Sequence, residues 1–295
     1  MKIQSVSVVV PGNNGSSACI NDCGPCVSRM HCERDSSYYP DRLSLYPEIY
    51  DRTIKDYVRR LDFCRDNGAN SLMITGQVEP QQNMSFLKDL SFILQRVQTP
   101  FRNVEMQTTG VGLDVEKLRF LRDAVGVNTL AVSLFSLDDE EDRWARRGAV
   151  RNIAKLCKMA VGEDFNLRLC MNMTKELTQT YTPEALFAAC AELGANQVTL
   201  RKLWSADDDS PQTHWVKEFG ATDADMLPHV TYLRDCAVLR TLEYGWTVRR
   251  VGAMSVVYDS DSMAKDGAKD DFKYLVVRPN GKLYSSWDDP ASLIF

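Results

Sequence analysis

Apolar residues follow two alternating patterns along the first two thirds of the chain. Short β-branched or apolar runs predict strands, and longer segments with apolar residues three and four positions apart predict helices. The strand pattern covers residues 6–10, 71–75, 103–108, 129–134, 167–173 and 198–203, and the helix pattern covers 46–67, 84–97, 115–125, 152–160 and 183–193. Strands that alternate with helices in this way predict a parallel sheet with helical crossovers.

The rhythm changes after Trp204. Residues 223–243 predict a helix that Pro228 interrupts, residues 247–251 and 255–258 predict short strands, and the segments around Pro279-Asn280-Gly281 predict a hairpin of residues 274–277 and 283–286. We therefore expect an α/β fold with two parts. Residues 1–204 would form a partial (β/α)6 TIM-like barrel, and residues 205–295 a C-terminal α+β extension that closes the barrel and shapes the substrate site.

Composition and charge limit the classes of partner. The chain has 295 residues and a net charge of −5, so a nucleic-acid duplex, which usually needs a basic face, is not an expected partner. No apolar run approaches the roughly 20 residues that span a bilayer. Residues 1–10 resemble a first strand and not a signal peptide. We therefore expect a cytoplasmic protein with no membrane partner.

Three of the nine cysteines lie within eight residues, and the other six are scattered singly. Cys19, Cys23 and Cys26 have the spacing CX3CX2C and follow the first predicted strand, so they lie where α/β barrels place their chemistry. Iron–sulfur clusters are held by thiolates. Three thiolates on one loop can hold three corners of a [4Fe–4S] cube and leave the fourth iron open to another ligand.

Two other interpretations of these cysteines stay open. A structural zinc site needs four ligands, and His31 or Cys32 could supply the fourth. A redox pair is the second, because Cys23 and Cys26 enclose Gly-Pro as in thioredoxin-like proteins. The third cysteine, four residues upstream of that pair, argues against the redox interpretation.

The CX3CX2C loop after the first strand resembles the signature of the radical SAM superfamily, and the resemblance covers residues 3–204. It is most similar to the branch that contains the molybdenum-cofactor GTP cyclase and peptide-modifying enzymes. The resemblance implies a [4Fe–4S] cluster that reductively cleaves S-adenosylmethionine (SAM). The resulting 5′-deoxyadenosyl radical abstracts hydrogen from a substrate. An electron donor such as flavodoxin or ferredoxin is also implied.

The resemblance also implies SAM contacts at the strand ends. Residues 75–80 resemble the glycine-rich turn that binds the SAM ammonium: Gly76, Glu79 and Pro80 match, while Gln77 and Val78 replace glycines. An ordinary strand-to-helix turn is the alternative. Thr108 and Ser133 match polar contacts of the family, although either could simply cap a helix. Pro25 stands where the family has a bulky residue against adenine, and Asn172 matches a polar residue near the ribose.

Side chains alternate between the two faces of a strand, which gives a prediction independent of the family. Polar residues share one face of three predicted strands and should point into the barrel, because helices cover the apolar outer face. These residues are Glu105 and Gln107, then Arg168, Cys170 and Asn172, and finally Thr199 and Arg201. Glu105 could pair with Arg168 or Arg201. Alternatively, either arginine could bind an anionic group of SAM or substrate.

Two expectations concern the reaction itself. Cys170 could donate hydrogen to a substrate radical, although a small buried thiol is the simpler interpretation. Cys236 is the one cysteine in the extension, so an auxiliary iron–sulfur cluster is not expected. This expectation favours a small-molecule or nucleotide substrate. A radical SAM enzyme that modifies a peptide or protein, and a non-catalytic zinc or iron–sulfur binding module, are the alternatives.

Overall fold

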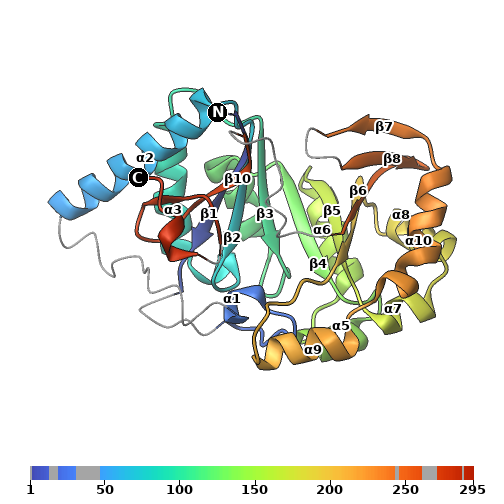
Figure 1. Cartoon of the computed structure of the whole chain (residues 1–295). Helices are drawn as coiled ribbons and strands as arrows, with labels where there is room; N and C mark the ends of the chain where they lie inside the picture. Colours follow the sequence, from blue (N-terminus) through green and yellow to red (C-terminus); the bar gives the residue numbers. More distant parts are fainter. Residues whose placement is uncertain (1, 13–18, 31–46, 243–245, 261–270, 288) are drawn as a thin grey trace.

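The computed structural model describes residues 2–12, 19–30, 47–242, 246–260, 271–287 and 289–295. Within these residues one eleven-stranded sheet has the order β11-β10-β1-β2-β3-β4-β5-β6-β9-β8-β7 (Figure 1). Its centre consists of six consecutive parallel strands: β1 (Lys2–Val10), β2 (Ser71–Gly76), β3 (Asn103–Thr108), β4 (Thr129–Leu134), β5 (Asn166–Met173) and β6 (Gln197–Lys202). The sheet does not close on itself, so the predicted partial barrel is confirmed.

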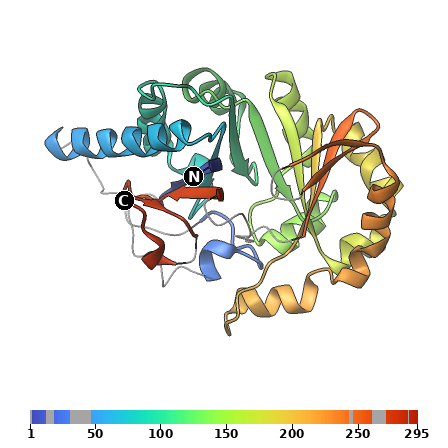
Figure 2. The same ribbon diagram turned by 45° about the horizontal axis from the view of Figure 1, so that its top comes forward.

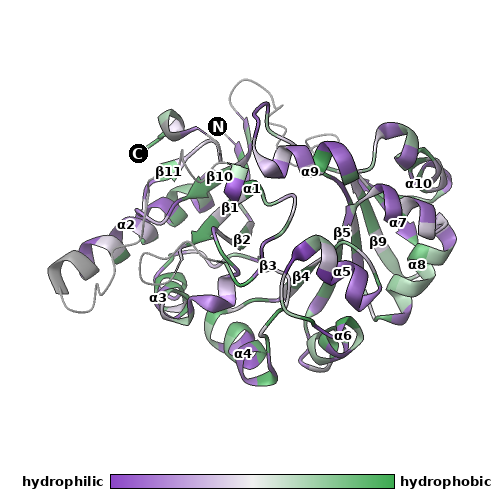
Figure 3. Cartoon of the chain, turned by 90° about the horizontal axis from the view of Figure 1, so that it is seen from below, coloured by the Kyte–Doolittle hydropathy of each residue, from purple (hydrophilic) through white to green (hydrophobic). Residues whose placement is uncertain are grey.

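Helices cover the convex side of the curved sheet, as Figure 3 shows for α3, α4, α6 and α8. The helices are α1 (Val27–Met30), α2 (Pro47–Asp66), α3 (Met84–Leu94), α4 (Val115–Phe120), α5 (Asp139–Arg146), α6 (Ile153–Gly162), α7 (Lys175–Thr180), α8 (Pro183–Glu192), α9 (Pro211–Phe219) and α10 (Asp223–Asp235). Of the helices described, none combines the length and apolar character needed to cross a membrane.

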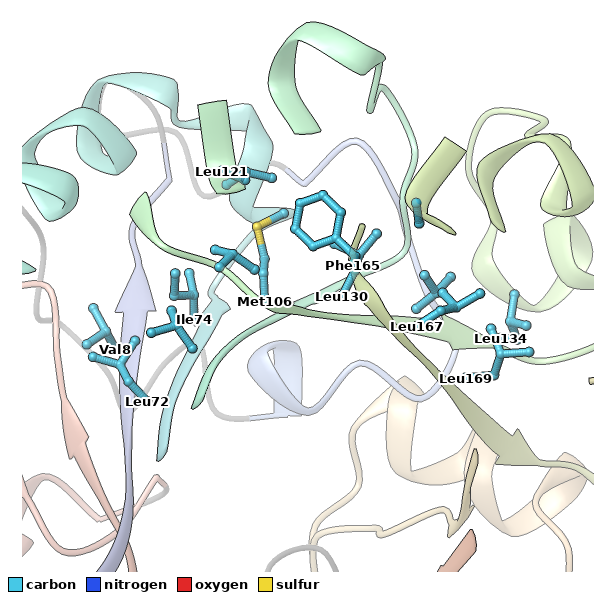
Figure 4. Close-up of a cluster of buried hydrophobic side chains, with 14 of the residues drawn as sticks. Val8, Leu72, Ile74, Met106, Leu121, Leu130, Leu134, Phe165, Leu167 and Leu169 are labelled. Carbon is cyan, nitrogen blue, oxygen red and sulfur yellow. The ribbon is translucent and has the colours of Figure 1, made fainter. Parts of the chain in front are cut away.

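The core between sheet and helices follows the predicted alternation along the strands. Leu167, Leu169, Met171 and Met173 of β5 are fully buried in one apolar cluster with residues of β2, β3 and β4. Figure 4 shows the side chains of Leu72, Met106, Leu130 and their neighbours gathered in this cluster. The alternate residues of the same strands are therefore left to the opposite, concave face.

Residues after Trp204 add strands to both edges of the central sheet. β9 (Met254–Asp259) pairs parallel with β6 and continues antiparallel into β8 (Thr247–Val251) and β7 (Val238–Thr241). At the other edge β10 (Asp271–Val277) pairs parallel with β1, and β11 (Leu283–Tyr284) forms the predicted hairpin with β10. Both chain ends lie on the β1–β10 side, near α2 (Figure 2).

A cation–π contact joins the two edges of the sheet. Nζ of Lys273 in β10 lies 3.8 Å from the ring centroid of Trp246, which directly precedes β8. These strands are far apart in the strand order, so the contact joins the β10 side to the β8 side across the open barrel.

The predicted helix over residues 223–243 was wrong in two respects, because α10 continues through Pro228 without interruption and ends short of residue 243. α10 ends at Asp235 and Cys236 has extended backbone angles, because the following residues pair with β8 as β7. α5, α7 and α9 were not predicted. Each is short and begins at a side-chain cap, from Asp138, Thr174 and Ser210 respectively. These caps are local signals that periodicity alone does not reveal.

His229 of α10 is buried, with 1% of its surface exposed. Burial lowers the pKa of its imidazole below the ordinary value, and the backbone of Tyr181 and the charge of Glu184 oppose that shift only in part. The folded chain therefore binds a proton at this site less readily than the unfolded chain does.

We expect the free energy of unfolding to decrease as the pH falls from about 7 to about 5. In this range His229 binds a proton in the unfolded chain but stays neutral in the folded chain. Urea denaturation across this range should show the loss, and His229→Leu should reduce its pH dependence. His214→Gln, at an exposed histidine, is the control. An unchanged slope in His229→Leu would contradict the assignment.

Candidate active site

The cysteine segment Cys19–Cys26 lies between β1 and α1, at the carboxyl end of the parallel strands. All three cysteines are free thiols that are partly buried. The backbone N–H of Asn21 donates to Sγ of Cys19 at 3.4 Å, and the N–H of Cys26 donates to the carbonyl of Cys23 at 3.2 Å. The segment is thus a folded turn that leads into α1.

Among the described residues, no three His, Cys, Asp or Glu side chains converge as a ready-made metal site. His31 and Cys32, considered as zinc ligands, lie outside the described residues. The three thiols are nevertheless within electrostatic reach of one another. Burial raises the pKa of the Cys23 thiol, negative charge on Cys26 and Cys19 raises it further, and Arg146 lowers it. Three thiols that interact on one loop are a donor set that fits an iron–sulfur cluster.

The C-terminal extension supplies one wall of this segment. Gly24 lies against the indole ring of Trp215 in α9, and a Cβ at this position would come within 2.4 Å of the ring. Trp215 belongs to an apolar cluster with Met30, Phe135, Ala145, Ala206 and Val216, against which Cys23 also packs. The cysteine segment is therefore held between α5 and α9, two helices that follow β4 and β6 (Figure 1).

Glu79, just after β2, is buried and accepts several hydrogen bonds. Its carboxylate accepts from the backbone N–H of Thr109 at 3.0 Å, from Oγ1 of Thr109 at 2.5 Å and from Oγ1 of Thr108. Nδ2 of Asn21 lies 3.4 Å from the same carboxylate. Burial raises the pKa of Glu79, while the hydrogen bonds from Thr108 and Thr109 lower it. Two residues predicted to contact SAM, Glu79 and Thr108, thus form a hydrogen bond with each other.

A buried group of charged residues lies next to the cysteine segment. Asp142 and Arg146 of α5 are fully buried, and Arg151 is nearly so. Both oxygens of the Asp142 carboxylate bind Arg151, at 2.9 and 3.1 Å, and Nε of Arg146 donates to it at 3.1 Å. The backbone N–H of Phe135 donates to Asp142 at 3.0 Å, and Arg151 donates to the carbonyl of Ser133 at 2.9 Å. The group therefore ties α5 to the carboxyl end of β4.

A second polar group lies on the concave face, deeper along the strands. Arg168 forms an ion pair with Glu105 and donates from Nε to Gln197 at 2.7 Å, so the predicted pairing of Glu105 with Arg168 is confirmed. Nε of Arg201 lies 3.6 Å from Asp259 in β9. Cys170 lies between these pairs; burial raises the pKa of its thiol, and Arg201 lowers it.

The sequence profile described as the Radical SAM superfamily matches residues 13–189, more than half of the chain. This chain belongs to the radical SAM superfamily. Members of the superfamily are enzymes that use a [4Fe–4S] cluster and SAM, so membership favours the iron–sulfur interpretation of the three thiols over zinc or thiol redox chemistry. Comparison with curated protein sequences gave no match.

Solved radical SAM structures share the fold. One is anSMEcpe with bound AdoMet and the Cp18Cys peptide, with a TM-score of 0.61, 12% identity, and coverage of 98% of this chain and 75% of that chain. Another is SuiB of Streptococcus suis bound to its precursor peptide SuiA, with a TM-score of 0.58, 15% identity, and coverage of 95% of this chain and 59% of that chain. This chain thus spans about three fifths of the SuiB chain. At these identities the likeness shows the fold alone.

The predicted site residues of this radical SAM chain differ in how far along the strands they lie. Gly76, Gln77, Glu79, Thr108 and Ser133 lie at or just beyond the carboxyl ends of the strands, near the cysteine segment, where Pro25 is buried in the turn. Asn172 is paired in register with Arg201, and Cys170 with Ser133, whereas Arg168 lies nearer the amino end of β5. Arg168 is therefore the predicted residue farthest from the cysteine segment along these strands.

Sequence reasoning missed the residues that hold the radical SAM site together: Asn21, Asp142, Arg146 and Arg151. One signal was available, because Asp142 and Arg146 are four residues apart and therefore share a helix face. The other pairings join residues that are separated along the chain and become visible only in the folded protein.

Asp142→Asn should destabilise the fold by about 3 kcal/mol or more, because it leaves two buried guanidinium groups without their counter-charge. Glu140→Gln, which removes the exposed partner of Arg143 on the same helix, should cost about 0.5 kcal/mol or less. Chemical denaturation of both variants measures the difference. Equal stabilities would mean that the buried charges contribute no more than the surface pair.

Proposed function

We propose that this radical SAM enzyme acts on a small-molecule or nucleotide substrate. The observation that carries the proposal is the polar concave face. The pair of Arg201 with Asp259 and the thiol of Cys170 lie near the strand ends that carry the SAM-contact positions, and the pair of Glu105 with Arg168 lies deeper along the strands.

Cys19, Cys23 and Cys26 would hold the cluster, which when bound supplies the electron for SAM cleavage to a 5′-deoxyadenosyl radical. The carboxylate of Glu79 and the Gly76–Gln77 turn would receive the SAM ammonium. A cation beside buried Glu79 favours its ionised form and so offsets the cost of burying that carboxylate. Thr108, Ser133 and Asn172 would provide polar contacts to the rest of SAM, and Pro25 would pack against adenine.

Residues 205–295 would shape the substrate site, which is supported by Trp215 at the cysteine segment and by Asp259 beside Arg201. Cys170 would give its thiol hydrogen to a substrate radical. The thiyl radical left behind would take an electron from the external donor, a flavodoxin or ferredoxin, and a proton from solvent, which restores the thiol. The expected cytoplasmic location stays a prediction from the sequence.

Modification of a peptide is the second candidate function. It is favoured by the two neighbouring structures that contain peptides, SuiA with SuiB and Cp18Cys with anSMEcpe, whose folds match nearly the whole of this chain. SAM-dependent activity on a short peptide, with none on nucleotides or other small molecules, would favour this candidate over the first.

Anaerobically purified protein should contain about four iron and four sulfide per chain and should release 5′-deoxyadenosine when mixed with SAM and dithionite. Single substitutions of Cys19, Cys23 or Cys26 by Ala should abolish both properties. Cys236→Ala, which changes a half-buried thiol of α10's C-terminal cap, is the matched control. Zinc without iron, or an intact cluster in all three variants, would overturn the proposal.

Arg201→Met should weaken the binding of SAM or substrate by about tenfold, the scale of one lost hydrogen bond to a charged group. Arg201 is favoured over Arg168 because Arg168 is already engaged by Glu105 and Gln197 through Nε, Nη1 and Nη2. Arg168→Met should mainly lower stability. Calorimetric titration with SAM, and KM for substrate, give the measurement; unchanged values for both ligands would remove Arg201 from the site.

A further inference from the structure

The cysteine segment caps the C-terminal end of α5. The last carbonyl groups of a helix have no partner within the helix. Here the carbonyl of Ala145 accepts the N–H of Gly24 at 3.0 Å, and the carbonyl of Arg146 accepts the N–H of Asp22 at 3.1 Å. α5 is itself fixed to β4 through Asp142. The backbone between the first and third cysteines therefore takes its position from α5.

The side chain of Asn21 extends this connection to two more strands. Its Oδ1 accepts from Nη1 of Arg146 at 2.7 Å, and its Nδ2 donates to Oγ1 of Thr109 at 3.0 Å and approaches Glu79 at 3.4 Å. Asn21 is 2% exposed and lies two residues from both Cys19 and Cys23. The buried amide of Asn21, which lies between two of the cysteines in the sequence, thus links the cysteine segment to the carboxylate after β2 and to the charge group on α5.

Gly148 shows how closely this connection is packed. A Cβ at Gly148 would lie 2.2 Å from Oδ1 of Asn21 and 2.5 Å from Nη1 of Arg146, distances at which atoms must move apart. The absence of a side chain here is therefore a condition for the contact between Asn21 and Arg146.

We propose that Asn21 and Arg146 are positioning residues that hold the cysteine segment in register with Glu79, so that the cluster site and the SAM site share one buried polar network. The inference rests on the proposed cluster ligands. Residues that orient metal ligands from behind typically alter metal affinity or activity by about 10- to 100-fold when substituted. Asn21 and Arg146 would act through the cysteines and Glu79 and not by touching the reacting atoms.

Gly148→Ala and Asn21→Leu test this from opposite directions, the first by adding bulk and the second by removing the amide. Both should lose iron to a chelator about tenfold faster than the parent protein. Both should also show a weakened change in the electron paramagnetic resonance spectrum of the reduced cluster when SAM is added.

Two controls separate positioning from stability. Gly162→Ala, at a helical glycine with nothing within 4 Å of the added Cβ, should behave like the parent. Met226→Ala removes a buried side chain of α10 and lowers stability away from the site. If Met226→Ala loses iron as fast as the two test variants, the effect is one of stability and the inference is wrong.

Iron retention and a SAM response at parental levels in both test variants would also overturn the inference. If Gly148→Ala does not fold, Asn21→Leu decides, since it adds no bulk at the contact. A parent chain that holds no cluster would instead refute the proposed function, so the two failures are distinguishable.

Discussion

Asp142 makes the interaction on which the site depends. Its buried carboxylate binds Arg146, Arg151 and the backbone N–H of Phe135. Burying three charges costs several kcal/mol each unless the geometry is good, and here the carboxylate is matched by two guanidinium groups and a backbone donor. These interactions fix the position of α5 relative to β4. The contacts from α5 to the cysteine segment therefore depend on Asp142.

The cysteine segment needs such external support because it is short and irregular. It has few hydrogen bonds of its own, so its shape depends on partners in α5, on Asn21 and on the ring of Trp215. The three thiols do not form a ready-made metal site, although negative charge on Cys19 and Cys26 raises the pKa of Cys23. The backbone of the segment is thus supported by α5 and Trp215, while the three thiols are only partly buried.

The two faces of the sheet differ in character, because the convex face is apolar and the concave face carries charged residues. The convex face buries Leu167, Leu169 and their counterparts under helices and supplies hydrophobic stabilisation. The concave face carries Glu105, Arg168, Arg201 and Asp259 in pairs that reach across strands. Pairing keeps these charges tolerable inside the molecule. Residues 205–295 contribute to both faces, since Asp259 pairs with Arg201 on the concave face and Met254 and Val256 join the apolar cluster of the convex face.

The sequence by itself determined the central barrel strands, the alternation of their two faces, the cysteine spacing and the family. These features rest on local periodicity and on residues close together along the chain, so no tertiary contact is needed to see them. The ion pair of Glu105 with Arg168 could be foreseen because strand alternation puts both on one face.

Only the tertiary structure decided how the extension is divided between the two sheet edges, that residues 238–241 form a strand, and that Asn21, Arg146 and Gly148 meet. Asn21 and Arg146 are 125 positions apart, and their contact exists only because α5 follows β4 to the end of the sheet where the chain leaves β1. Long-range pairing of this kind depends on the packing of whole elements, and no local pattern encodes it.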